Sequence, residues 1–554
     1  MNAGTKRTRF FRQLKTQFYG SAWPRISPGE EPPLRAELFS ADQMEQHGRS
    51  LAVLHKLAPG YTPDPLLARL AANESVLVGV CSLLKAAVTA RRRIMPAGEW
   101  LLDNFYLIEE HIRTTKRHLP KGYSQELPRL AHGPSAGLPR VYDIALETIS
   151  HGDGRVDAEN LGRFVAAYQS VTALKLGELW AIPIMLRLAV IENLRRVAMW
   201  IAAGLDERDL ADSWADQMTE IAEKDPKSLI LVIADMARSS PPMAGSFVAE
   251  LARRLQGQGP ALALPLTWIE QRLFESGLKI EQLVQSENQQ QAADQVSISN
   301  SIGSLRFLGA MNWREFVETM SVVEQKLQED PSGVYGQMDF ATRDHYRHVV
   351  ERVAKFSPLT EREIARKAIQ LAHEAALTHG SSDRSAHVGF YLIGSGLDEL
   401  ERTTQARLSI PETIRRAGGR FPLLIYTGAI GLIAVIVSGG LVATAYADGA
   451  PDWVLALVGS VSLLAASQLA MGLVNWLATL LVTPHPLPKM DFSAGIPPLL
   501  CRCTMSWPLG QRLNRQAWAM KAWLVLRCFL AERPRQARPW CKRPAMLTGW
   551  IVAC

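Results

Sequence analysis

Two apolar runs decide how this chain is organised: FPLLIYTGAIGLIAVIVSGGLVATAYA at residues 421–447 and WVLALVGSVSLLAASQLAMGLVNWLATLLV at residues 453–482. Neither run contains a charged residue, and only DGAPD at residues 448–452 separates them. A helix rises about 1.5 Å per residue and the hydrocarbon core of a bilayer is roughly 30 Å thick, so about 20 uncharged residues can cross it. The pair predicts a two-helix transmembrane hairpin rather than two buried helices of a soluble domain.

The basic residues beside these runs predict the orientation of the hairpin. They are Arg402, Arg407, Arg415, Arg416 and Arg420 before the first run, and Lys489 and Arg502 after the second. No Lys or Arg lies between the runs. Because basic residues are retained on the cytoplasmic side during insertion, we expect both flanks of the hairpin, and both termini, to be cytoplasmic.

Two amide side chains, Gln468 and Asn475, lie inside the second run. An amide within a bilayer needs a hydrogen-bond partner, so we expect both to face the first run or another helix. The runs contain no acidic or basic residue that would mark a transport pathway, so a transporter is not favoured.

Composition limits the remaining possibilities. At 554 residues and 47% hydrophobic content, the chain can bury a sizeable core beyond the hairpin, so we expect two or three structural units. The net charge of +7 is modest for this length and does not imply nucleic-acid binding. Before Leu499 there is one cysteine, Cys81, so this part has no disulfide framework and suits a reducing cytosol. The basic segment from Lys6 to Lys15 is followed by no apolar run, so we expect no signal peptide.

The pattern along the chain predicts an all-α protein. Its expected parts are a basic, largely irregular arm (1–63), a cytosolic multi-helix domain (64–416), the hairpin (421–447 and 453–482), a linker (483–498) and an aberrant tail (499–554). Within the arm, a helix is expected around Ala41–Leu57. The basic cluster of the arm could lie against anionic headgroups or be a solvated segment.

The clearest helix of the multi-helix domain is expected at Leu174–Leu205. Its apolar residues recur every three or four positions, at Leu179, Ile182, Leu186, Val190, Leu194 and Val197. Arg187, Glu192, Arg195 and Arg196 are expected on its other faces and argue against a third span. Pro183 should either mark a helix start or leave a kink.

Caps and turns predict several element boundaries. Asp157, Asp225 with Pro226, and Thr360 should each begin a helix, and Thr360 with Glu363 forms a capping-box pattern. Turns are expected at 151–154 and 257–260, where glycines cluster. The polar stretch 285–301 is expected to be a surface loop or an exposed helix end.

Three groups of residues resemble metal sites, but each falls short. Ser150–Asp157 alternates carboxylates with glycine, yet lacks the ligand spacing and closing Glu of a calcium loop, so a turn leading into a helix cap is favoured. His345 and His348, with Asp344, have no visible third ligand. His373-Glu374 with His379 misses the i, i+4 spacing of a zinc-protease helix. We assign no catalytic, cofactor-binding or metal-binding residue.

Several motifs occur in order along the chain: WLLDNFYLIEEHI (100–112), LPRL (127–130), GLPRVY (137–142), LGELWAIP (176–183) and, after the second run, LPKMDFSAGIP (487–497). Together they resemble the N-terminal region of the very large cyclic β-1,2-glucan synthases of bacterial inner membranes. The resemblance extends to Pro498, where the segment is similar to the one that introduces the cytosolic glucosyltransferase domain of that family.

The resemblance implies a membrane enzyme that polymerises glucose from UDP-glucose, with Mg²⁺ or Mn²⁺ bound in a transferase domain beyond Pro498. This chain would then supply a membrane anchor and a scaffold for that domain, or a guide for the nascent β-1,2-glucan. We expect it to need no cofactor of its own and to be inert alone. The alternative is a self-sufficient membrane-anchored helical adaptor that binds a protein partner, and the oligomeric state is open.

The sequence departs from that family after Pro498. Residues 499–554 hold five of the six cysteines, Cys501, Cys503, Cys528, Cys541 and Cys554, and a single carboxylate, Glu532. This composition, rich in cysteine and poor in carboxylates, matches no earlier part of the chain. The cysteines also lack the paired spacing of a metal site. We interpret the tail as an out-of-frame or disordered segment and assign it no function.

Overall fold

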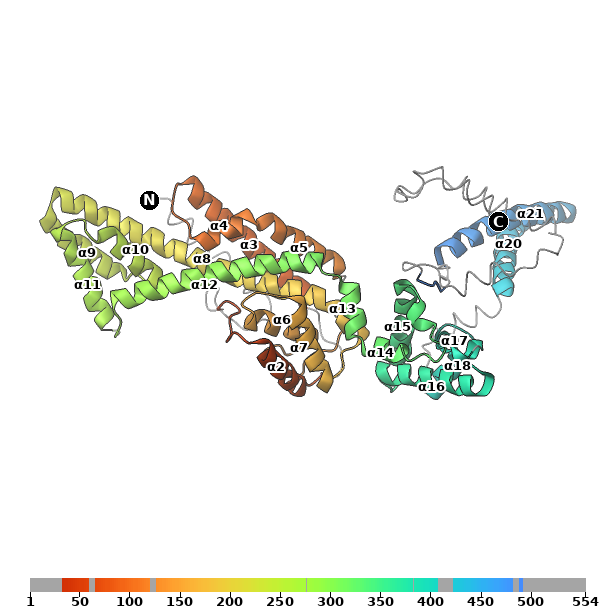
Figure 1. Cartoon of the computed structure of the whole chain (residues 1–554). Helices are drawn as coiled ribbons and strands as arrows, with labels where there is room; N and C mark the ends of the chain where they lie inside the picture. Colours follow the sequence, from red (N-terminus) through yellow and green to blue (C-terminus); the bar gives the residue numbers. More distant parts are fainter. Residues whose placement is uncertain are drawn as a thin grey trace, which may run out of the picture. The chain divides into compact units, whose positions relative to one another are not determined.

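The computed structural model describes residues 32–58, 65–119, 126–275, 277–381, 383–406, 422–481 and 488–491. The basic cluster of the arm, the flanking arginines 407–420, and the tail 499–554 lie outside these residues. The chain divides into two units, Met1–Pro488 and Lys489–Cys554. Within the described ranges the fold is all-α, as predicted, and β-type pairing is confined to isolated bridges such as Leu57 with Leu130 (Figure 1).

The helices before the hairpin are α2 (Ala41–Leu54), α3 (Leu66–Thr89), α4 (Pro96–Asp103), α5 (Phe105–His118), α6 (Arg140–His151), α7 (Ala158–Val171), α8 (Leu176–Lys224), α9 (Leu229–Ser239), α10 (Gly245–Leu255), α11 (Ala263–Phe274), α12 (Ile280–Ala310), α13 (Trp313–Met320), α14 (Val322–Leu327), α15 (Phe340–Lys355), α16 (Glu361–His379), α17 (Gly389–Leu392) and α18 (Leu397–Thr403). The hairpin consists of α20 (Pro422–Ala447) and α21 (Asp452–Leu481).

Helix α8 is the central element, because its two halves contribute to two different cores. Its first half, up to Leu205, packs among α3, α5, α6 and α12, and its second half packs against α9 and α10 (Figure 1). The predicted stripe from Leu179 to Val197 is buried throughout. The helix extends 19 residues beyond the predicted end at Leu205, to Lys224, and continues through Pro183 without beginning there.

The charged residues of α8 lie off the apolar stripe, as predicted, but this face is not open to solvent at Glu192, which is fully buried with its neighbour Asn193. Ile184, Met185 and Leu188 are buried as well, so residues 181–194 of α8 are enclosed on nearly every side. A helix in such a position must neutralise its charges internally.

Helix α12 corrects the prediction for residues 285–301. The stretch is not a loop but part of a 31-residue helix, and its first part, residues 285–293, is the exposed or half-buried N-terminal portion of that helix, as the second alternative predicted. Ser297 and Ser301 are buried, and both accept a hydrogen bond from Asn193 of α8, at 3.1 and 3.2 Å. What the sequence did not predict is that the later polar residues of this stretch, Asp294, Ser297 and Ser301, lie on a buried face of the helix.

Helix α2 forms where expected and ends three residues earlier, at Leu54. Ser40 and Gln43 form a capping box at its start. Met44, Leu51 and Ala52 are buried in the core that surrounds α8. Residues 32–58 thus belong to the helical body, although the sequence placed them in the irregular arm.

The predicted caps and turns are confirmed. Asp157 accepts from the backbone N–H of Asn160 at 2.9 Å, Asp225 caps a short 3₁₀ turn, and Thr360 forms the capping box. The turn after α6 uses positive φ at Asp153 and Gly154. At Gly154 a Cβ would come within 2.5 Å of the Ser301 hydroxyl, so only glycine fits this approach.

Candidate functional site

The hairpin helices contact each other through small residues. Ala434, Ala466 and Ala470 are buried between them, and the hydroxyls of Ser438 and Ser462 lie 2.9 Å apart. Small residues allow close approach of two helices, which is how helices associate in a bilayer where the hydrophobic effect is absent. The outward faces keep large apolar side chains such as Leu464 exposed. This is the surface that lipid, and not water, would cover.

Polar and aromatic side chains of the hairpin are placed as a bilayer requires. The hydroxyl of Tyr426 on α20 donates to the Asn475 amide oxygen at 2.9 Å, which confirms that Asn475 faces the first helix. Gln468 is instead exposed on α21 and does not face the first helix; that it faces another helix stays a prediction. Tyr446 and Trp453 flank the turn and are both exposed, a position typical of a membrane–water interface.

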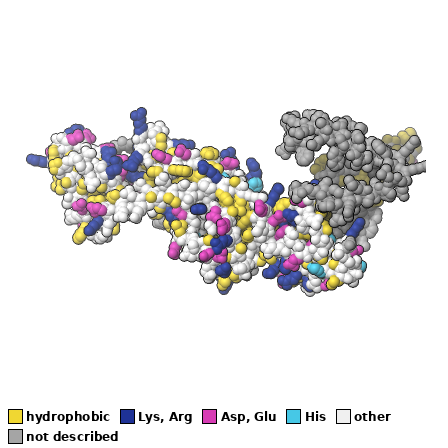
Figure 2. Space-filling model, viewed as in Figure 1, with side chains coloured by type: hydrophobic (Ala, Val, Ile, Leu, Met, Phe, Trp, Pro, Cys, Tyr) yellow, Lys and Arg dark blue, Asp and Glu magenta, His cyan; other side chains and the backbone are white. Residues whose placement is uncertain are grey.

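A third helix, α3, is also long and apolar enough to cross a membrane. In its most apolar window 39% of the residues are buried, against 11% and 17% for the two hairpin helices. Its Arg69 pairs with Glu192 on α8, and its Glu74 pairs with Lys116 on α5. Helix α3 is therefore a core helix of the helical body. The surface of this body, on the face shown in Figure 2, mixes apolar side chains with charged side chains of both signs.

Three of the sequence motifs that carry the family resemblance, LPRL, GLPRVY and LGELWAIP, meet in the structure. Arg140 of GLPRVY donates through Nε and Nη2 to the carboxylate of Glu178 of LGELWAIP, both at 2.6 Å, and both side chains are at most 3% exposed. Burial lowers the pKa of Arg140, but the bonds to Glu178 outweigh it and hold the pKa above its ordinary value. Arg129 of LPRL donates to the carbonyl of Gly137 at 2.7 Å. These motifs therefore build a structural joint between α6 and α8.

Glu192 is the centre of a second buried cluster. Its carboxylate accepts hydrogen bonds from three arginines and one amide: Arg69 (2.7 and 3.0 Å), Arg195 (2.9 Å), Arg196 (3.0 Å) and Asn73 (2.9 Å). Burial raises the pKa of Glu192, but the charges of Arg195, Arg69 and Arg196 outweigh burial and lower the pKa well below its ordinary value. The carboxylate is ionised and saturated, so it ties α3 to α8 and is no general acid or base.

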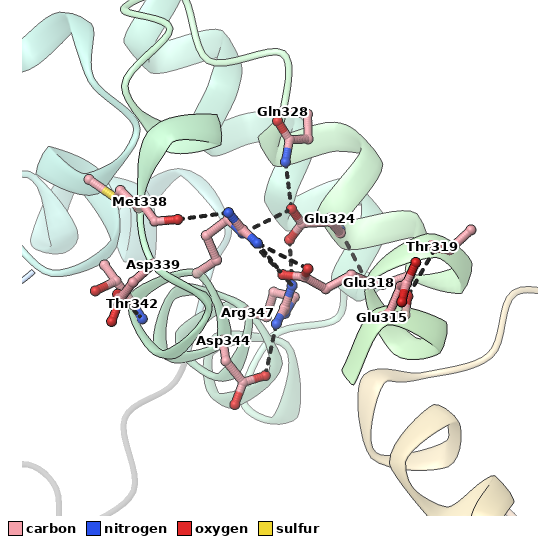
Figure 3. Close-up of polar contacts among 12 residues, drawn as sticks. Glu315, Glu318, Thr319, Glu324, Gln328, Met338, Asp339, Thr342, Asp344 and Arg347 are labelled. Carbon is pink, nitrogen blue, oxygen red and sulfur yellow. Dashed lines mark hydrogen bonds and ion pairs between the residues drawn. The ribbon is translucent and has the colours of Figure 1, made fainter. Parts of the chain in front are cut away.

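A third cluster joins α13, α14 and α15 around the fully buried Arg347 (Figure 3). Arg347 donates to Glu324 at 2.6 Å, to Glu318 at 3.0 Å and to Asp344 at 3.1 Å. Arg343 donates twice to Glu318, at 3.0 Å. Each carboxylate is thus committed to a guanidinium, which leaves none of them arranged as a pair for a divalent metal.

Asp330, Ser332 and His387 have the residue types of a hydrolase triad but not its geometry. The Ser332 hydroxyl and the Asp330 carboxylate both lie at Nδ1 of His387, at 3.2 and 2.8 Å. A triad needs the serine at one ring nitrogen and the aspartate at the other. Burial raises the pKa of Asp330, but the hydrogen bonds from His387, Ser332 and the Val388 N–H outweigh burial and hold the pKa below its ordinary value. This carboxylate is therefore a structural acceptor.

The structure places the metal-like patterns of the sequence as follows. Asp157 is a helix cap, and Asp153 pairs with Arg35 at 3.2 Å. His348 is half exposed and bonds the Asp344 carbonyl at 2.8 Å. The residues compared above with a zinc-protease helix are exposed on α16; they are His373, Glu374 and His379.

The group of described residues that could hold a metal is a different one: His47, Glu147 and His151. The i, i+4 spacing of Glu147 and His151 was visible in the sequence, but nothing there pointed to His47, 100 residues away.

The apolar hairpin and the all-helical body define a membrane-associated helical protein. No family model matches the chain. It is 30% identical over 470 residues to the "Cyclic beta-(1,2)-glucan synthase NdvB" of Rhizobium meliloti (strain 1021), a match that covers 84% of this chain. The resemblance read from the motifs is thereby confirmed. The chain spans about one sixth of that relative, since the match covers 16% of its length.

Proposed function

We propose that this chain anchors and scaffolds a UDP-glucose-dependent glucosyltransferase of the cyclic β-1,2-glucan synthase type in a bacterial inner membrane. The observation that carries the proposal is the similarity to the Rhizobium synthase across 84% of the chain. Two features support it: the hairpin presents apolar surface for lipid, and the helical body commits the buried carboxylates of Glu178, Glu192 and Glu324 to arginines. The nascent glucan is a partner that the body would guide or release.

Glucosyl transfer needs a carboxylate set that holds Mg²⁺ or Mn²⁺ on the diphosphate, and a further carboxylate as base. We expect the purified 554-residue chain in detergent, given labelled UDP-glucose with either metal, to incorporate no label into protein or glucan. The Rhizobium synthase purified in the same way is the positive control. A chain in which residues 1–498 precede the remaining part of that synthase should incorporate label. Labelling by the 554-residue chain itself would show that catalysis resides in its own residues.

Both ends of the hairpin are proposed to be cytoplasmic, with the DGAPD turn outside. In a background without the six native cysteines, a cysteine at Ala450 should react with a membrane-impermeant maleimide added from the periplasmic side. A cysteine at Thr403, which is exposed at the end of α18, should react only after the membrane is opened. The reverse pattern would contradict this orientation.

A further inference from the structure

Three metal-ligand side chains converge from two helices of the helical body. Glu147 and His151 lie one turn apart on α6, and His47 approaches them from α2. The Glu147 carboxylate oxygen Oε2 is 2.8 Å from Nε2 of His47 and 3.3 Å from Nε2 of His151. The three ligand atoms all lie within 4.8 Å of one another.

The ring of His151 is fixed by its surroundings. Its Nδ1 lies 2.7 Å from the backbone carbonyl of Glu37, which can only accept, so Nδ1 carries the hydrogen. Phe39 stacks on the same ring at 3.7 Å and lies edge-on to His47 at 5.5 Å. With one hydrogen on the ring, Nε2 of His151 turns its lone pair toward Glu147. A hydrogen bond from the far nitrogen to a carbonyl is the usual support of a metal-ligating histidine.

This arrangement places two acceptors against each other. A lone pair on His151 Nε2 and a carboxylate oxygen at 3.3 Å repel unless a cation lies between them or the ring gains a second proton. His47 meets the same oxygen from its own side, so both imidazoles converge on one atom. A cation at this point would satisfy all three groups at once.

We propose that His47, Glu147 and His151 bind one divalent transition-metal ion of the zinc class, with water as the fourth ligand. Two imidazoles and one carboxylate suit Zn²⁺, whereas Mg²⁺ and Ca²⁺ prefer oxygen ligands. Tetrahedral zinc with bonds of about 2.0–2.2 Å separates its ligands by about 3.3–3.6 Å. Glu147 already lies 3.3 Å from His151, whereas His47, at 2.8 Å, would have to move slightly away from it. The side chains of His47 and Glu147 are 26% and 30% exposed, which leaves room for water.

The site would join α2 to α6. It is independent of the glucosyltransferase proposal, because it uses no residue of the hairpin or of the buried arginine–carboxylate clusters. A zinc ion with ligands on both helices would fix their separation. The competing explanation is a hydrogen-bonded His–Glu–His cluster in which a ring carries a second proton. Such a cluster differs from the zinc site in that it binds no metal.

The test is metal binding by the full chain in detergent, without a histidine tag, after treatment with a chelator. The five cysteines after Leu499 are replaced by serine, so that thiolates do not bind the metal. We expect one Zn²⁺ per chain in calorimetry, and with Co²⁺ in its place the intense visible absorption of a tetrahedral site. Zinc should also raise the thermal unfolding temperature. His47→Ala and His151→Ala should each weaken zinc binding by at least about tenfold.

The matched control is His373→Ala, which removes an exposed histidine elsewhere and should bind zinc like the parent. If an alanine variant fails to fold, Glu147→Gln keeps a hydrogen-bonding side chain but loses the anionic ligand, and it should lose zinc binding with unchanged helix content. Absence of saturable binding at 100-fold excess Zn²⁺, or equal binding by the parent and all three ligand variants, would overturn the site and leave the hydrogen-bonded cluster.

Discussion

Replacing Leu186 by Asp is expected to unfold the core around the first half of α8. Leu186 is 0% exposed, in a helix whose neighbouring faces are also buried. The change removes a buried leucine and places a carboxylate where no cation is adjacent in the stripe. Loss of the side chain alone, as in Leu186→Ala, costs about 2–5 kcal/mol, and an unpaired buried charge adds several more. We expect loss of cooperative thermal unfolding, measured by circular dichroism on the purified chain in detergent.

The matched control is Leu377→Asp on α16, where the leucine is 89% exposed. A surface change of this kind should alter the free energy of unfolding by no more than about 0.5 kcal/mol. Equal melting temperatures for Leu186→Asp and Leu377→Asp would contradict the enclosed position of α8. A graded series from Leu186→Ala to Leu186→Asp separates the effect of the cavity from that of the charge.

The sequence predicted the elements whose signal is local. The hairpin helices begin and end within one residue of the predicted runs, because absence of charge over 27 and 30 residues and the DGAPD turn are both read directly. Asp157 and Thr360 announce helix starts through side chains that bond the backbone only three residues away. The apolar stripe of α8 follows from the helical period alone.

The sequence did not predict which polar residues are inside. Periodicity identifies the apolar face of a helix, but not whether a second helix covers its polar face. Glu192 is buried because Arg69, 123 residues earlier, reaches it. The serines of α12 are buried because Asn193 lies opposite. Such pairs depend on helices that are distant in the chain, and nothing in either local sequence marks the partner. For the same reason, the sequence did not identify His47 as a neighbour of Glu147.

Glu192→Gln is expected to have the second large effect. The substitution keeps the shape of the side chain but removes the charge that holds Arg69, Arg195 and Arg196 together. Three guanidinium groups, each at most 18% exposed, would then lose the buried anion that they share. Breaking a buried ion pair on one side typically costs about 3–5 kcal/mol. At pH 7 the variant should therefore melt well below the parent, whereas Glu270→Gln, at an exposed position on α11, should not.

The contribution of Glu192 to the free energy of unfolding should depend on pH. The folded-state pKa of Glu192 lies well below the ordinary value of 4.5, because the three arginine charges outweigh the effect of burial. The unfolded chain therefore takes up the proton first as the pH falls. The stabilisation by Glu192 is complete above about pH 4.5 and is lost as the pH drops toward the folded-state pKa.

Once protonated, Glu192 resembles glutamine, so the difference in unfolding free energy between the parent and Glu192→Gln should shrink steadily below pH 4.5. Because both proteins share every other titrating group, including His111, whose pKa burial lowers to about 4, those contributions cancel in the difference. Chemical unfolding of both proteins from pH 7 down to pH 3 measures it directly. A difference that stays constant across this range would mean that the arginines do not depend on the charge of Glu192.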